Sequence, residues 1–114
     1  MRKIEKKEEV FGGKGSVFME HLLEREQLGG MCGLFNKVTL KPGCSLGYHV
    51  HQGDSEAYYI LSGEGSYENN GREKMTVVPG DVAFTKNGEG HSISNEGTEP
   101  LVFIALVINE EKRV

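Results

Sequence analysis

Turn residues interrupt the apolar segments of this chain at short and regular intervals. Lys41-Pro42-Gly43, Gly63-Glu64-Gly65 and Pro79-Gly80 are turn signals, and Asn69-Asn70-Gly71 contains the Asn-Gly pair that favours tight hairpins. Between them lie short runs rich in β-branched and aromatic residues, spaced roughly 8–12 residues apart. Such spacing is typical of antiparallel sandwiches and barrels, so the 114-residue chain is predicted to be all-β.

The whole chain, 1–114, is predicted to form one domain, since domains cluster near about 100–150 residues. Its first ten residues are mostly charged and are expected to form a short N-terminal arm, 1–10. Val17–Leu23 fits either a helix or a strand, and Glu24–Leu28 fits one turn of helix. The predicted strands are Met31–Leu40, Leu46–His51, Glu56–Leu61, Ser66–Glu68, Glu73–Val78, Asp81–Phe84, His91–Asn95 and Leu101–Ile108.

Composition argues against several classes of protein. The chain has 13 basic and 17 acidic side chains and no basic stripe, so we expect no nucleic-acid partner. Its longest apolar run, Leu101–Ile108, is far shorter than the ~20 residues of a membrane helix, so we expect no membrane partner. No apolar signal segment follows the charged start, which favours a cytoplasmic protein whose Cys32 and Cys44 are reduced thiols.

Three of the four histidines lie in patterned segments. His49 and His51 alternate on a predicted strand, and side chains at i and i+2 share one face about 6.6 Å apart. Glu56 opens the next strand, and His91 begins a later one. Three imidazoles and one carboxylate suit a divalent metal such as Mn, Fe, Ni, Co or Zn. The fourth, His21, lies on a polar segment and is expected to be an ordinary surface residue.

Two spaced patterns carry a resemblance to a known family. Gly43–Gly63 reads G-x5-H-x-H-x4-E-x6-G, which resembles the first motif of the cupin superfamily at every specified position. Gly80–Asn95 is similar to the second motif, G-x5-P-x-G-x2-H-x3-N, except that Lys86 replaces the usual proline. The resemblance implies a double-stranded β-helix, or jelly-roll barrel. It also implies that His49, His51, Glu56 and His91 bind one divalent metal ion.

Strand alternation indicates which side chains line the pocket. If Glu56 faces inward, then Tyr58 and Ile60 also face inward, whereas Ala57, Tyr59 and Leu61 face outward. On the preceding long strand the inward residues would be Leu34, Asn36, Val38 and Leu40. Asn36 and Tyr58 are therefore candidate substrate contacts. The aromatic residues Phe35, Tyr48 and Phe84 are expected in the core.

The resemblance extends to oxalate decarboxylase-like bacterial cupins of small, single-domain size. It implies a metal-dependent enzyme of dioxygenase, decarboxylase or isomerase type that acts on a small carboxylate or another oxygen-rich metabolite. Leu46 occupies the position at which the decarboxylases carry an arginine that helps hold oxalate, so oxalate turnover is not expected. The alternatives are a non-catalytic cupin that binds or senses a small ligand or sugar, and a structural module braced by metal.

The last predicted strand suggests a partner subunit. Leu101–Ile108 is apolar on both alternating faces, although a strand with one face in water should alternate with polar residues. Tyr59 and Leu61 are expected on the same outer side. We therefore predict a homodimer through this face. The alternative is cover by the chain's own segment Val10–Leu23.

Overall fold

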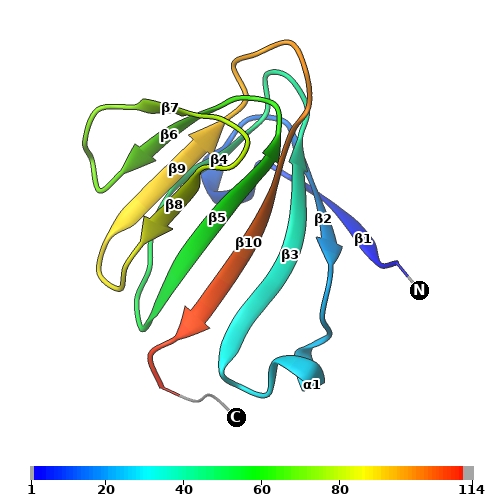
Figure 1. The fold of residues 1–114 in the computed structure, drawn as a ribbon, viewed down its shortest axis with the longest axis vertical. Helices are drawn as coiled ribbons and strands as arrows, with labels where there is room; N and C mark the ends of the chain where they lie inside the picture. The colour runs from blue at the N-terminus through cyan, green and yellow to red at the C-terminus, as the bar shows by residue number, and fades with distance from the viewer. Residues whose placement is uncertain (1, 112–114) are drawn as a thin grey trace.

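The computed structural model describes residues 2–111, and nearly all of its regular structure is β-strand (Figure 1). One short helix and one 3-10 turn are the exceptions in this range. The elements are β1 (Ile4–Glu8), η1 (Val10–Gly12), β2 (Ser16–His21), α1 (Arg25–Leu28), β3 (Cys32–Leu40), β4 (Ser45–Val50), β5 (Asp54–Ser62), β6 (Gly65–Asn69), β7 (Met75–Val77), β8 (Val82–Thr85), β9 (Gly90–Ser94) and β10 (Leu101–Asn109).

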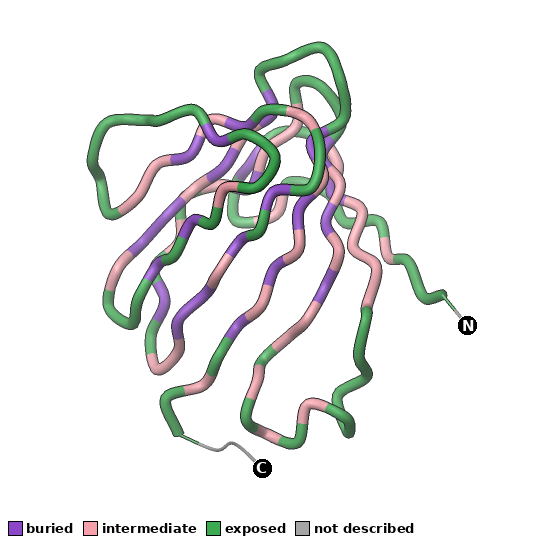
Figure 2. The backbone as a smooth tube through the Cα atoms, viewed as in Figure 1, coloured by how far each residue is buried: buried purple, intermediate pink, exposed green. Residues whose placement is uncertain are grey.

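The strands form two antiparallel sheets. The larger sheet has the order β1-β2-β3-β10-β5-β8, and the smaller has the order β4-β9-β6-β7. Buried and more exposed residues alternate along the strands, as Figure 2 shows for β10 and β5. On β10 the buried side chains are Leu101, Phe103, Ala105 and Val107. The core therefore lies between the sheets, and the predicted all-β jelly-roll fold is confirmed.

Alternation places the residues of β5 as predicted. Glu56, Tyr58 and Ile60 are buried between the sheets, whereas Tyr59 and Leu61 are exposed. On β3, the inward positions Asn36, Val38 and Leu40 are buried, and Leu34 is partly buried. The motif glycines Gly43, Gly63 and Gly80 all have a positive φ, which suits the sharp turns predicted there.

The prediction that three aromatic residues lie in the core is wrong. Phe84 is 51% exposed and Tyr48 is 45% exposed, and Phe35 is only partly buried. Phe84 pairs with Ala57, which is an outward position of β5, so Phe84 also faces outward. Aromatic character favours a strand but does not select the face of the sheet.

The N-terminal segment belongs to the larger sheet. Residues Ile4–Glu8 of the expected arm form β1, which pairs with β2 from Ile4↔Glu20 to Glu8↔Ser16. The ambiguous segment is a strand, and α1 begins after Glu24, whose side chain forms a capping box with Gln27. β1 and β2 extend the larger sheet beyond β3, so they do not cover the outer face of β10. The predicted alternative, in which Val10–Leu23 covers this face, is therefore wrong.

Two further features concern cellular context. No helix among residues 2–111 has the length and apolar character needed to cross a membrane. Cys32 and Cys44 are both free thiols.

Candidate metal centre

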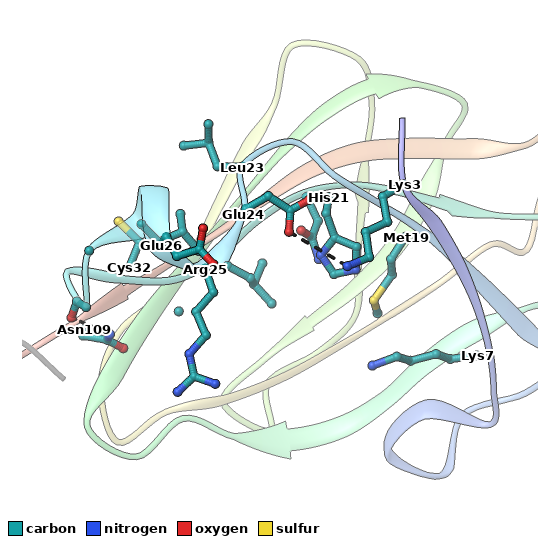
Figure 3. A pocket seen from close by; sticks show the side chains of 16 residues that line it. Lys3, Lys7, Met19, His21, Leu23, Glu24, Arg25, Glu26, Cys32 and Asn109 are labelled. Carbon is teal, nitrogen blue, oxygen red and sulfur yellow. Dashed lines mark hydrogen bonds and ion pairs between the residues drawn. The ribbon is translucent and has the colours of Figure 1, made fainter. Parts of the chain in front are cut away.

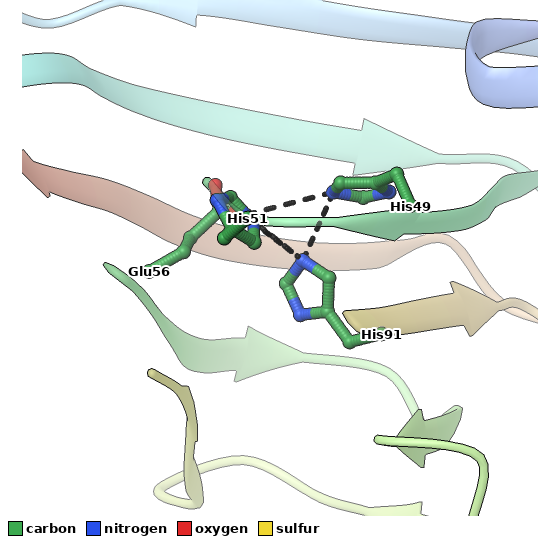
Figure 4. A group of neighbouring side chains, drawn as sticks. All are labelled: His49, His51, Glu56 and His91. Carbon is green, nitrogen blue, oxygen red and sulfur yellow. Dashed lines mark hydrogen bonds and ion pairs between the residues drawn. The ribbon is translucent and has the colours of Figure 1, made fainter. Parts of the chain in front are cut away.

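Four side chains converge between the two sheets (Figure 4). His49 lies on β4, His51 directly follows that strand, His91 lies on β9, and Glu56 lies on β5. His49 and His91 are opposite each other in the β4–β9 pair. The three imidazoles therefore come from the smaller sheet or its end, while the carboxylate comes from the larger sheet. All four residues predicted from the sequence meet at one place.

The Nδ1 atom of each imidazole is committed to a partner. His49 Nδ1 donates to Gly47 O at 2.8 Å, and His51 Nδ1 donates to Asp54 Oδ1 at 2.7 Å. His91 Nδ1 lies 2.9 Å from Thr85 Oγ1 and 3.0 Å from the Tyr67 hydroxyl. A second hydrogen bond at the far nitrogen is typical of metal-binding histidines, because it fixes the tautomer. The three Nε2 atoms are thereby left as the potential ligands.

The hydroxyls behind His91 form a buried network. Thr85 Oγ1 donates to Asn69 Oδ1 at 3.2 Å and can accept the proton on His91 Nδ1. The Tyr67 hydroxyl also contacts Thr85 Oγ1. Thr85 is fully buried and Tyr67 is nearly so. This network holds the orientation of the His91 ring.

The donor atoms are spaced as metal ligands are. His91 Nε2 lies 3.0 Å from His49 Nε2 and 3.1 Å from His51 Nε2. Glu56 Oε1 lies 3.0 Å from the Nε2 atoms of His51 and His91, and 4.0 Å from that of His49. Lone pairs that face one another at such distances are stable only around a proton or a cation.

These spacings fit an octahedral ion. With ligand bonds of ~2.1 Å, neighbouring donors of an octahedron lie ~3.0 Å apart and opposite donors ~4.2 Å apart. The 3.0 and 3.1 Å separations match neighbours, and the 4.0 Å separation of His49 and Glu56 is near that of opposite donors. Four donors leave two of six positions for other ligands. The residues present therefore fit the divalent metal that the sequence predicted.

The charges at the centre follow from burial and hydrogen bonding. Burial acts to raise the pKa of the Glu56 carboxyl, but hydrogen bonds with the three histidines outweigh it and hold this pKa well below its usual range. Glu56 therefore remains a carboxylate. Its hydrogen bond with His51 raises the pKa of that imidazole despite burial, whereas burial lowers the pKa of His91. Of these two imidazoles, His51 is therefore the one that protonates more readily.

Two aromatic rings flank the histidines. Tyr58 stacks on His91 with ring centroids 4.9 Å apart, and its hydroxyl lies 3.4 Å from His91 Nε2. Burial raises the pKa of Tyr58 well above its usual value, so the hydroxyl remains protonated. On the other side, Phe11 stacks on His49 at 3.8 Å, with 16° between the planes. Phe11 has a φ of 53°, and nothing in the sequence identified it.

The other sequence-predicted residues lie at varied distances from this centre. Asn36 faces the interior on β3, as expected for a pocket residue. Lys86 is exposed in a turn, where its backbone N–H donates to Glu89, so the departure from proline does not alter the cluster. His21 is not an ordinary surface residue, because it is partly buried and contacts Glu5. Sequence reasoning missed Tyr67, Thr85 and Asp54, of which only Asp54, inside the first motif, offered a signal.

Comparisons with known proteins show which proteins this chain is similar to. The cupin domain family matches residues 36–108. The oxalate-binding protein of Thermotoga maritima is 47% identical over 97 residues, which cover 85% of this chain and 79% of that protein. The oxalate decarboxylase of Bacillus subtilis is 32% identical over 73 residues, which cover 60% of this chain and 19% of that protein.

A similar crystal structure extends the likeness to the whole fold. It is that of a predicted oxalate decarboxylase from Thermotoga maritima, with a TM-score of 0.91 and 44% identity. The likeness covers 95% of this chain and 93% of that one.

Proposed function

The chain belongs to the cupin domain family, and we propose that it binds a small, oxygen-rich carboxylate at a divalent metal ion held by His49, His51, Glu56 and His91. The observation that carries this proposal is the convergence of three Nε2 atoms and one carboxylate oxygen, with every Nδ1 committed elsewhere. A bound divalent ion would supply Lewis-acid polarisation of a ligand oxygen.

The residues beside the centre are suited to hold such a ligand. The protonated Tyr58 hydroxyl can donate a hydrogen bond to an oxygen bound near His91. Asn36 presents an amide from the same inner face of the larger sheet, two strands away from Tyr58. We propose these two residues as ligand contacts, because both are buried polar groups on the face that carries Glu56.

Two observations bear on oxalate. The likeness to an oxalate-binding protein supports a carboxylate ligand. However, Leu46 is 5% exposed and belongs to the apolar core, so it cannot replace the arginine that resemblance to the decarboxylases implies at this position. Binding of a carboxylate is therefore better supported than decarboxylation of oxalate.

Catalysis is a second candidate function. The Tyr58 hydroxyl is a protonated group within 3.4 Å of a metal-ligand atom, which is where a proton donor of a dioxygenase, decarboxylase or isomerase would be needed. Binding or sensing without turnover is the alternative. Incubation of metal-loaded protein with small acids, followed by product analysis, separates the two, and in Tyr58→Phe turnover should fall much further than ligand affinity.

The proposed function is tested by metal analysis and calorimetry. Protein purified without added metal should contain one divalent ion per chain and should bind oxalate only before chelation. The double variant His51→Ala/His91→Ala should lose both properties. His21→Ala is the matched control, because this histidine lies outside the cluster and should keep the ion. Equal metal content in wild type and the double variant would refute the proposal.

We also propose that the protein is a homodimer through the outer face of the larger sheet. The outer side chains of neighbouring strands meet in apolar rows, such as Leu106 with Ala57 and Ile104 with Tyr59. The most exposed members are Val82, Phe84, Tyr59, Ile108 and Leu61. A two-fold contact would bury this face against itself.

A further inference from the structure

The turn between β1 and β2 lies against β4. It consists of residues 9–15, which include η1, and we call it the strap. The Glu9 N–H donates to Gly15 O at 2.9 Å and closes the strap at its base. Two further hydrogen bonds tie the strap to β4: the Lys14 N–H donates to Ser45 Oγ, and the Ser45 N–H donates to Lys14 O, both at 2.8 Å. The strap is therefore fixed to the edge strand of the smaller sheet.

Two glycines let the backbone of the strap approach the backbone of β4. A Cβ atom at Gly47 would lie 2.0 Å from Phe11 O, and a Cβ atom at Gly13 would lie 2.2 Å from Ser45 O. No other residue fits at either position without displacement of the strap, since glycine alone lacks this atom. This close approach brings the Phe11 ring to the metal centre.

The Phe11 ring covers one face of the His49 imidazole. The two rings are stacked with centroids 3.8 Å apart, whereas His51 and His91 meet His49 edge-on at 5.2 and 4.5 Å. Phe11 is the one ring stacked on His49 in the described part of the chain. The Phe11 side chain is 59% exposed, but that of His49 beneath it is only 11% exposed. Phe11 therefore separates His49 from solvent.

The backbone of the strap adopts an unfavourable conformation to hold this ring. Phe11 has a φ of 53° and Glu9 a φ of 46°, both in the left-handed region that residues with a Cβ atom adopt at a cost. Because the Phe11 side chain is more than half exposed, burial of apolar surface offers little compensation. Residues held in such conformations cluster at functional sites. Glycine would be free of this cost at position 11, so the aromatic side chain needs another explanation.

The metal centre does not open into the large cavity beside α1 (Figure 3). This cavity measures about 820 Å³, and its lining includes none of the four donor residues and no residue of the strap. Arg25 extends into it from α1, away from the strap. Substitutions in this cavity can therefore serve as controls for changes at the metal centre.

We propose that Phe11 is a positioning residue for metal binding. Its ring fixes the plane of the His49 imidazole, so that Nε2 faces the other three donors, and it keeps water from that imidazole. His49 is the donor residue with the most exposed side chain, at 11%, against 1% for His91. Phe11 does not touch the other donors and acts through His49. This inference rests on the proposed metal site and specifies what holds one of its ligands.

Cobalt(II) binding, measured by stopped flow and visible absorption, tests the role of Phe11. Phe11→Gly removes the ring and also relieves the backbone, so the Tm of the metal-free protein should stay close to that of wild type. The Kd for cobalt should nonetheless rise about threefold to tenfold, since a stacked aromatic pair contributes about this factor. The rise should appear as faster dissociation, and the absorption bands of the bound cobalt should change because His49 is less firmly held. Phe11→Tyr keeps the ring and should retain the wild-type Kd and spectrum.

Two matched controls separate the effect of the ring from that of its surroundings. Glu9→Gly relieves the same kind of backbone conformation in the strap but leaves the Phe11 ring in place. Arg25→Ala alters the cavity beside α1, which the strap does not line. Both variants should keep the wild-type Kd and spectrum.

Three results would overturn the inference while the proposed function stands. One is a wild-type Kd and spectrum in Phe11→Gly. Another is an equal rise in its association and dissociation rates, which would make Phe11 an obstacle to entry rather than a support for His49. If Phe11→Gly does not fold, Phe11→Leu replaces it, and wild-type binding by Phe11→Leu is the third. If wild type itself binds no cobalt, the proposed function fails and the inference fails with it.

Discussion

His49 and His91 lie directly opposite each other on β4 and β9, and their Nε2 atoms are 3.0 Å apart. Strand pairing alone therefore brings together two residues that are 42 positions apart in the chain. A shift of one residue in this register would turn one of the two imidazoles to the outer face. The metal centre therefore depends on the register in which β4 and β9 pair.

Removal of the ion should lower thermal stability, and the effect should depend on pH. Binding to the folded state alone stabilises it by about 2.7 kcal/mol when free metal exceeds the Kd a hundredfold, which corresponds to a rise in Tm on the order of 10 °C. Ligation requires neutral imidazoles, and Glu56 raises the pKa of His51, so protons displace the ion as the pH falls. Chelator should therefore lower Tm clearly at pH 7 and much less at pH 5. Identical melting curves with and without chelator at pH 7 contradict a stabilising metal.

Thr85→Val should weaken metal binding without removing a ligand. The substitution keeps the shape of the side chain but deletes the oxygen that lies 2.9 Å from His91 Nδ1. Loss of such outer contacts typically lowers metal affinity about 10–100-fold. Competition with a fluorescent chelator measures the change. Thr76→Val, at an exposed position of β7, is the control and should retain the wild-type affinity.

Asn36→Leu should lower the affinity for the ligand without lowering the stability of the fold. Leucine removes the buried acceptor that lacks a donor, so the free energy of unfolding of the ligand-free protein should stay the same or rise by about 1 kcal/mol. Affinity of the metal-loaded protein for oxalate should fall, because Asn36 is a proposed ligand contact. Urea denaturation and calorimetry provide the two measurements. A large loss of stability would show that Asn36 supports the fold rather than a ligand.

Negative charges introduced on the outer face of the larger sheet should dissociate the dimer. Light scattering of wild type at micromolar concentration should give about twice the 12.6 kDa of one chain. Val82→Glu/Phe84→Glu, at the most exposed apolar positions of β8, should give the monomer mass. Val50→Glu places one carboxylate on an exposed residue of the other sheet and should leave the dimer intact. A wild-type mass near 12.6 kDa refutes the dimer.

The sequence predicted those features that depend on spacing along one strand or within one motif. Glu56, Tyr58 and Ile60 are buried because side chains alternate with a period of two, and the motif spacing located all four candidate ligands. The short and regular spacing of the turn residues likewise predicted the all-β fold class. These inferences need no knowledge of what lies beside a strand.

Features that depend on distant partners were missed. β1 is a charged edge strand, and such strands lack the apolar alternation that marks interior ones. His21 contacts Glu5 on that strand, and contacts with Thr85 and Tyr67 orient the ring of His91. The exposure of Phe84 and Tyr48 depends on which face of a sheet each side chain occupies. Sheet pairing decides all of these, and the residue types alone do not.

Because the four donors come from two sheets, a bound ion would also hold those sheets together. An ion held by His49, His51 and His91 on one side and by Glu56 on the other would connect the two sheets. Without it, separation of the layers costs less free energy, and backbone amides of β4 and β9 should exchange with solvent more rapidly. Supply of metal in the cell would then set how long each copy of the chain survives proteolysis, as well as whether it binds a ligand.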